Sequence, residues 1–287
     1  MSRADPWAKP RVLPLITWLY VVWSIVPVLI AIAFSFNSGR SRSTWQGFSV
    51  RWWWTDAGSV AKDDSLQLAV RNSLLLGLVT IVIVVPLGVL LAIGLARWRS
   101  RLSHGANLIS LIPLVTPEIV MGAALFIVFK ELYTGVPLGR GAQILGHVTF
   151  TLSFVVVIVR GRLVAIGPVY EEAARDLGAK AHQALRLVIL PLLWPAIFAS
   201  VVIVFATSLD DFVIASFLSS GAGTETVPIR IYSSARGGAT PALNAVATVM
   251  LIITMGVIGL GFLVLSRARK RRGGEGDAVG DLAGFSL

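Results

Sequence analysis

The chain contains no cysteine, and only 14% of its 287 residues are charged. Without cysteine it can form neither a disulfide framework nor a thiolate metal site. It also lacks the spacings of a phosphate-binding P-loop, a two-histidine zinc helix and a serine-hydrolase nucleophile turn. The sequence therefore predicts no enzyme and no cofactor of its own, and any ATP-driven step would need another chain.

Apolar residues, by contrast, are abundant. Hydrophobic residues make up 55% of the chain and its mean hydropathy is +0.79, which excludes an ordinary soluble domain and indicates a multi-pass membrane protein. A net charge of +10 could indicate nucleic acid, but the basic residues lie in loops between apolar runs. Orientation in the membrane is the simpler cause, so no nucleic-acid partner is expected.

The expected fold is an all-α membrane protein with six transmembrane helices. The six apolar stretches cover residues 13–36, 72–96, 106–129, 143–159, 191–211 and 242–265. A cleaved signal peptide is the alternative for the first stretch, with Ala31-Ile32-Ala33 as the cleavage site. Its apolar core exceeds the ~7–15 residues of such signals, so we expect an uncleaved helix. In the third stretch, Thr116 as N-cap, Pro117 and Glu118 predict a break or kink.

Basic residues indicate the orientation. Residues 1–12, 97–104, 160–190 and 266–287 hold sixteen of the 25 Lys and Arg residues, so both termini are expected in the cytoplasm. The domain organisation is then a cytoplasmic segment 1–12, a permease domain 13–265 and a disordered basic tail 266–287.

Two long loops would lie on the outer side. Residues 37–67 carry Trp45, Trp52, Trp53 and Trp54, which are expected at the membrane interface, with docking of a soluble partner as the alternative. Residues 212–241 are expected to be irregular.

A charged island, Tyr170–Pro195, separates the fourth and fifth stretches. Its apolar and charged residues alternate at helical spacing, which predicts a short amphipathic helix ending at Gly178. Pro191 suits the first turn of the next span. The island therefore predicts a helix-turn-helix outside the membrane, with a purely structural role as the alternative.

This island resembles the E-A-A-x3-G-x9-I-x-L-P signature of permease subunits of binding-protein-dependent ABC importers, with Val188 replacing isoleucine. The resemblance implies a coupling helix that sits in a groove of a cytoplasmic ATPase. The coupling residues implied in this chain are Glu172, Ala173, Ala174, Asp176, Gly178, Leu190 and Pro191.

Three acids lie within or at the edge of apolar stretches: Glu118, Asp210 and Asp211. Uncompensated charge costs at least ~2.5–3.5 kcal/mol there, so such residues are candidates for function. A helix rising ~1.5 Å per residue puts Asp210 and Asp211 about 28 Å from Pro191, near the outer mouth, with Glu118 near mid-depth. The alternatives are a helix-start acid for Glu118 and a solvated helix end for the aspartates. Two carboxylates without a third ligand do not predict a metal site.

Segments around these acids resemble the spermidine/putrescine importer permeases, the C-type subunit in particular. They include Ser208–Phe217, Thr226-Val227-Pro228, Thr240–Ala245 and Pro117–Met121, where the family often has aspartate in place of Glu118. The resemblance implies a substrate path for amines lined by the three acids. Phe205, Phe212 and Tyr232 could add stacking or cation–π contacts.

The resemblance also implies partners and a location. These are a homologous B-type permease, two ATPase subunits that bind ATP and magnesium, an external substrate-binding protein, and the bacterial inner membrane. Another small solute, such as a different amine or an aminophosphonate, is the alternative cargo. A channel or scaffold would explain the spans but not the signature.

Overall fold

The computed structural model describes residues 12–41, 43–97, 100–237 and 240–271. Nearly all of the expected N-terminal segment and residues 272–287 of the expected disordered tail lie outside this range. Within it the regular elements are helices, and the one isolated bridge pairs Asn37 with Phe48. The elements are α1 (Val12–Phe34), α2 (Arg51–Trp54), α3 (Asp64–Arg97), α4 (Arg101–Val115), α5 (Glu118–Ile127), η1 (Val128–Leu132), α6 (Arg140–Ile166), α7 (Val169–Asp176), α8 (Ala181–Ala184), η2 (Leu185–Ile189), α9 (Leu190–Asp210), α10 (Val213–Phe217), η3 (Ala222–Thr224), α11 (Val227–Gly237) and α12 (Ala242–Arg271).

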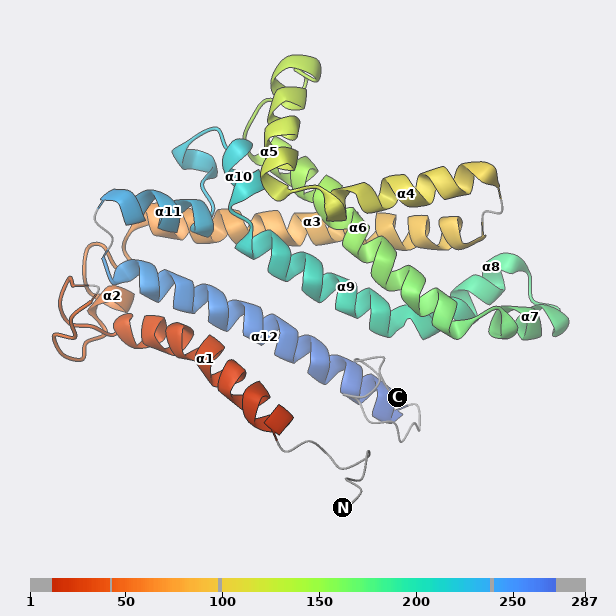
Figure 1. Cartoon of the computed structure of the whole chain (residues 1–287), viewed down its shortest axis with the longest axis horizontal. Helices are drawn as coiled ribbons and strands as arrows, with labels where there is room; N and C mark the ends of the chain where they lie inside the picture. Colours follow the sequence, from red (N-terminus) through yellow and green to blue (C-terminus); the bar gives the residue numbers. More distant parts are fainter. Residues whose placement is uncertain (1–11, 42, 98–99, 238–239, 272–287) are drawn as a thin grey trace, which may run out of the picture. The chain divides into compact units, whose positions relative to one another are not determined.

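The all-α membrane fold is confirmed. In the described part of the chain, five helices are long and apolar enough to cross a membrane, and one bent pair brings the number to six. These elements match the six apolar stretches in order. The predicted break of the third stretch is also present, because α4 and α5 meet at an angle of 107° around Thr116-Pro117 (Figure 1).

Three details of the helices differ from the sequence-based expectation. Thr116 does not cap α5, because its hydroxyl donates instead to the Ile112 carbonyl, 2.8 Å away. Residues 212–241, expected to be irregular, contain α10 and α11, whose short apolar runs pack locally. α12 continues to Arg271, so residues 266–271 of the expected tail are helical; Lys and Arg are good helix formers and extend a span readily.

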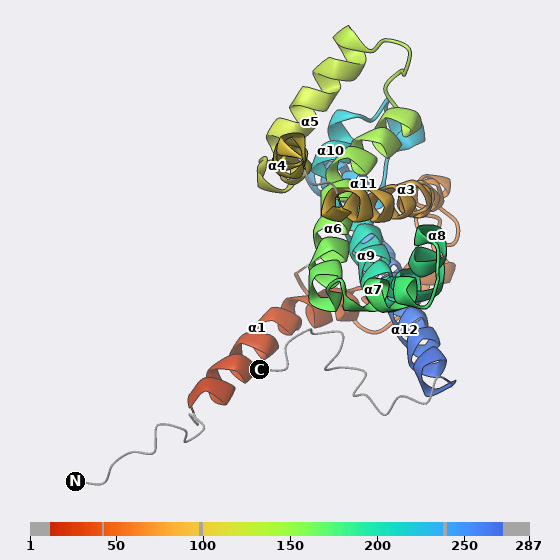
Figure 2. The same ribbon diagram turned by 90° about the vertical axis from the view of Figure 1, so that its right-hand side faces the viewer.

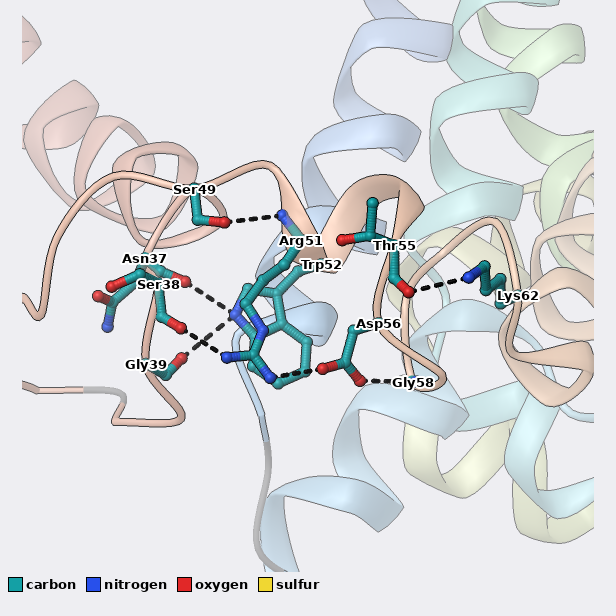
Figure 3. A network of polar contacts seen from close by, with 10 residues as sticks. All are labelled: Asn37, Ser38, Gly39, Ser49, Arg51, Trp52, Thr55, Asp56, Gly58 and Lys62. Carbon is teal, nitrogen blue, oxygen red and sulfur yellow. Dashed lines mark hydrogen bonds and ion pairs between the residues drawn. The ribbon is translucent and has the colours of Figure 1, made fainter.

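The described residues divide into two compact units, one drawn from the ranges 1–64 and 234–249 and one from the ranges 65–233 and 250–287. In the first unit, the loop after α1 folds around Trp52, which is only 1% exposed (Figure 3). The Trp52 indole donates to the Asn37 carbonyl at 2.8 Å, and the Arg51 guanidinium lies over its ring. Trp45 and Trp54 are exposed and therefore available to a membrane interface, whereas Trp52 is buried within the loop.

Arg51 links both ends of this loop. Its guanidinium donates to the Ser38 carbonyl at 2.9 Å and to the Asp56 carboxylate at 2.5 Å (Figure 3). The hydrogen bond from Arg51, followed by that from the Gly58 amide, holds the pKa of Asp56 below its usual value. The loop is therefore an ordered polar and aromatic cap rather than a flexible connector.

In the second unit, α3, α6 and α9 lie side by side in both ribbon views (Figures 1 and 2). Their shared core is made of buried aliphatic side chains, among them Val84, Val155, Leu193 and Val204. A smaller cluster joins α5, α6 and α10 through Met121, Ala142, Ile214 and Leu218. α5 and α10 approach closely at Gly122, where an added Cβ would lie 2.7 Å from the Phe217 ring. This second cluster positions the acidic residues described below.

Candidate coupling surface and acidic site

The coupling helix predicted from sequence is α7, and its end has a specific cause. Gly178 has φ +87°, a conformation that residues with a Cβ rarely adopt. Its amide donates to the Arg175 carbonyl at 2.8 Å, and the Ala179 amide donates to the Ala174 carbonyl at 3.0 Å. This hydrogen-bond pair is a Schellman motif. No neighbouring atom would touch an added Cβ at Gly178, so backbone conformation, not space, requires the glycine.

The surface of α7 is strongly exposed. Leu177 is 90% exposed, and Val169 and Tyr170 are also exposed although they are large and apolar. Glu172, Ala173 and Asp176 share this exposure, while Ala174 is partly covered. The residues named from the signature therefore lie on a surface open to a partner, apart from Leu190 and Pro191.

Leu190 and Pro191 contribute to the packing and the helix geometry of the fold rather than to the exposed surface. Leu190 packs against the α3–α6–α9 core, and Pro191 is in the first turn of α9 as expected. The preceding turn, η2, is π-helical, and the Leu190 amide donates back to Leu185. Proline has no amide hydrogen and crowds the carbonyl four residues earlier, which a wider turn accommodates. α8, η2 and α9 thus form one helical run from Ala181 to Asp210.

An acid that was not singled out from sequence ties α7 to the spans. Glu171 accepts from Arg97, at the end of α3, and from Arg175, one turn along α7, both at 2.6 Å. Figure 1 shows α7 and α8 together at one end of this helical unit. The pairing was not foreseeable from sequence, because the two residues are 74 positions apart.

At the other end of α9, Asp211 and Asp210 differ in environment. Asp211 is buried and its carboxylate accepts from the Ile214 and Ala215 amides at 3.2 and 2.8 Å, which caps α10. Asp210, the last residue of α9, is exposed. The aspartate pair therefore combines one structural and one accessible carboxylate.

The bend between α4 and α5 brings Glu118 to this place. Its carboxyl interacts directly with that of Asp211 and feels the charge of Asp210. The expectation that Glu118 lies at a different depth from the aspartates is thus wrong. The break at Thr116-Pro117 was expected but its direction was not, and the 107° bend turns the start of α5 toward the end of α9. Within the described residues, no set of three His, Asp or Glu side chains is arranged to hold a metal ion.

The three aromatic candidates separate into two groups. Phe205 is buried and packs against Gly77 of α3, which places it in the helix core. Phe212 and Tyr232 contact each other, with ring centroids 4.5 Å apart, and Tyr232 is exposed. Of the three, only this second pair, in which Phe212 directly follows Asp211, has a surface that a ligand could reach.

Polar residues overlooked in the sequence hold the segment after α10. The Asn72 amide donates to the Gly223 and Glu225 carbonyls at 3.1 and 2.9 Å, and the Gln143 amide donates to Ala215 and Thr224. His147, one turn after Gln143 on α6, has its ring beside Asp211. An amide and an imidazole inside an apolar stretch are the signals that could have identified these residues.

Comparison with known proteins identifies the family. The family model for binding-protein-dependent transport system inner membrane components matches residues 84–272. The putrescine transport system permease protein PotI of Escherichia coli K12 is 36% identical over 274 residues, covering 93% of this chain and 94% of its own. The spermidine/putrescine transport system permease protein PotC of Shigella flexneri is 35% identical over 250 residues, covering 87% and 92%.

Solved structures support the fold. A chain of a bacterial ABC transporter for the acidic polysaccharide alginate superimposes with a TM-score of 0.72 at 15% identity, covering 89% of this chain and 95% of that one. A chain of the MetNI methionine ABC transporter superimposes with a TM-score of 0.57 at 21% identity, covering 70% and 93%. This chain therefore belongs to the family of binding-protein-dependent transport system inner membrane components, the membrane-spanning permeases of ABC importers.

Proposed function

We propose that this permease forms part of the translocation path of an ATP-driven polyamine importer. The carrying observation is the contact of Glu118 with Asp211, to which Asp210, at the end of α9, adds a neighbouring negative charge. Neighbouring carboxylates repel each other, so a cation between them is favoured and an anion is not. The relatives named for spermidine and putrescine support the same cargo class.

The coupling half of the proposal rests on α7. The exposed apolar and acidic surface of α7 binds a cytoplasmic ATPase. The contact of Glu171 with Arg97 transmits the motion of α7 to α3. ATPase closure would move α7, and the spans would re-pack between outward-open and inward-open states. The assembly proposed is this chain, a homologous permease, two ATPase subunits that bind ATP and magnesium, and an external binding protein.

Uptake of labelled putrescine and spermidine by the reconstituted complex tests the cargo. Glu118→Gln and Asp210→Asn remove a charge but keep the size of the side chain. Each should reduce uptake about tenfold, the effect of losing ~1.4 kcal/mol of favourable interaction. Glu131→Gln, which removes an exposed carboxylate in η1, is the matched control and should transport normally.

Two outcomes would contradict the cargo assignment. If both acid variants transport amines as the wild type does, the acidic site does not serve the path. If the wild-type complex carries an aminophosphonate and no amine, the cargo class is wrong while the permease role stands.

A further inference from the structure

His147 is a buried polar side chain for which the proposed function so far has no use. It lies on α6, and its side chain and that of Asp211 are each only 1% exposed. An imidazole in such a place is unfavourable unless a polar group faces it. Its Nε2 atom lies 3.0 Å from Asp211 Oδ2, but the N–H direction is not aligned as in a hydrogen bond. The imidazole and the carboxylate are therefore in close polar contact without the alignment of a full hydrogen bond.

Asp211 is held from two sides. Oδ1 and Oδ2 accept from the Ile214 and Ala215 amides at the start of α10, and the imidazole faces Oδ2 from α6. Ile214 and Leu218 then pack against Ala142 of the same helix α6. The carboxylate thus connects α6 to the hairpin that follows α9.

The other two acids have no comparable support. Glu118 touches Asp211 and feels the charge of Asp210, and Asp210 itself is exposed. Asp211 is faced by the His147 imidazole and accepts from the Ile214 and Ala215 amides, in addition to its contact with Glu118. Its negative charge is therefore largely satisfied within the protein, unlike that of Glu118 or Asp210.

We propose that His147 is a positioning residue: it holds the Asp211 carboxylate on α10, which leaves Glu118 and Asp210 as the acids that meet the cargo. The part of this inference that concerns the cargo rests on the proposed function. The part that concerns the placement of α10 does not. Removing the imidazole leaves a buried carboxylate without its facing partner, which is more damaging than removing both groups together.

The first experiment measures amine uptake by the reconstituted complex. His147→Leu should lower uptake about tenfold or more, because a buried charge loses its partner. His147→Gln places an amide donor near the position of Nε2 and should restore at least half of that loss on a logarithmic scale. Thr149→Val, on the exposed face of the same helix, is the matched control and should leave uptake unchanged.

The second experiment asks whether His147 acts through Asp211. If it does, amine uptake by the double variant His147→Leu with Asp211→Asn should be no lower than uptake by the less active of the two single variants. Multiplied losses in the double variant would overturn the proposal, as would wild-type uptake in His147→Leu.

The third experiment needs no substrate. The chain lacks cysteine, so Ser216→Cys gives one thiol on α10, where the native residue is partly buried. His147→Leu should raise its labelling rate several-fold and His147→Gln should not. Equal rates in all three backgrounds would overturn the proposal. If the wild-type complex imports no amine but the thiol result holds, the cargo assignment fails and the positioning role of His147 remains.

Discussion

At the scale of single residues, each functional candidate is defined by what surrounds its side chain or backbone. Glu118, Asp210 and Asp211 are alike in sequence but not in the fold, where one is half-buried, one exposed and one buried as a cap. Gly178 is defined by its φ angle, since nothing crowds it. The same change of residue type therefore has different consequences at positions that resemble each other in sequence.

Gly178→Val should disconnect transport from ATP hydrolysis. A β-branched residue is strongly disfavoured at φ +87°, so α7 would change its exit direction and displace the exposed Leu177. We expect uptake to fall at least about tenfold, a free-energy change of ~1.4 kcal/mol or more. Gly178→Asn is the matched control because asparagine tolerates this conformation, and it should keep most of the activity. Equal activity of the two variants would contradict a conformational role for this position.

A second residue-scale prediction concerns Asp56 in the loop after α1. Because the pKa of Asp56 is lowered in the folded state, its contribution to loop stability is present above the unfolded value of 3.8 and is lost as pH falls through the folded value. Asp56→Asn imitates protonation at neutral pH. It should increase proteolysis of residues 37–63 modestly, with Glu131→Gln, which removes an exposed carboxylate outside this loop, as the control for a change of charge alone. No change in cleavage would mean that the Arg51 contact does not stabilise the loop.

At the scale of elements, the segment 160–190 is a pair of short helices attached to the ends of two long ones. α7 is stabilised at its end by the Schellman motif and at its start by the Glu171 contacts to Arg97 and Arg175. Exposed ion pairs usually contribute less than ~1 kcal/mol, so their use here is to orient α7 rather than to hold the fold together.

The orientation of this element can be measured directly. Lys180→Cys introduces the only thiol of the chain, in the turn between α7 and α8. With the cytoplasmic location proposed here, an impermeant maleimide should label it in broken membranes and not in intact cells. Labelling from outside would contradict both the orientation and the coupling role. An introduced cysteine at Ser43, in the loop after α1, should be labelled in intact cells as well as in broken membranes.

Charge on α7 provides a further test. Glu172→Lys reverses an exposed charge on the proposed ATPase contact and should lower binding-protein-stimulated ATP hydrolysis several-fold without preventing membrane insertion. Glu131→Lys, an exposed charge reversal in η1, is the control. Normal stimulation in Glu172→Lys would show that the contact does not use this side chain.

At the scale of the whole molecule, the chain is a helical membrane unit that leaves much apolar surface uncovered. α1 has no buried residue along its length, although it is apolar throughout. Lipid and partner subunits are the available cover, in keeping with a subunit of a larger permease assembly.

Purified gently from its native membrane, the chain should therefore bring with it a second permease and an ATPase in a 1:1:2 ratio, measured by native mass spectrometry. Recovery of the chain alone, while an active ATPase is found in other fractions of the same preparation, would contradict the proposed assembly.

The sequence by itself determined the class of the protein, the number of apolar spans and the position of the short helix α7, for which a coupling role is proposed. These depend on local properties: the length of apolar runs, helical periodicity, and the backbone freedom of Gly178. It also placed the break at Thr116-Pro117, since proline restricts the residue before it and cannot donate a hydrogen bond.

Only the tertiary structure decided which acids meet. The direction of the bend after α4 brings Glu118 to Asp211, and no local pattern specifies a direction in space. Phe205 was placed in the core and Trp52 inside a folded loop by packing against residues distant in sequence. His147 acquires its partner 64 positions away for the same reason: electrostatic contacts between helices depend on how the helices pack, which periodicity within one helix does not encode.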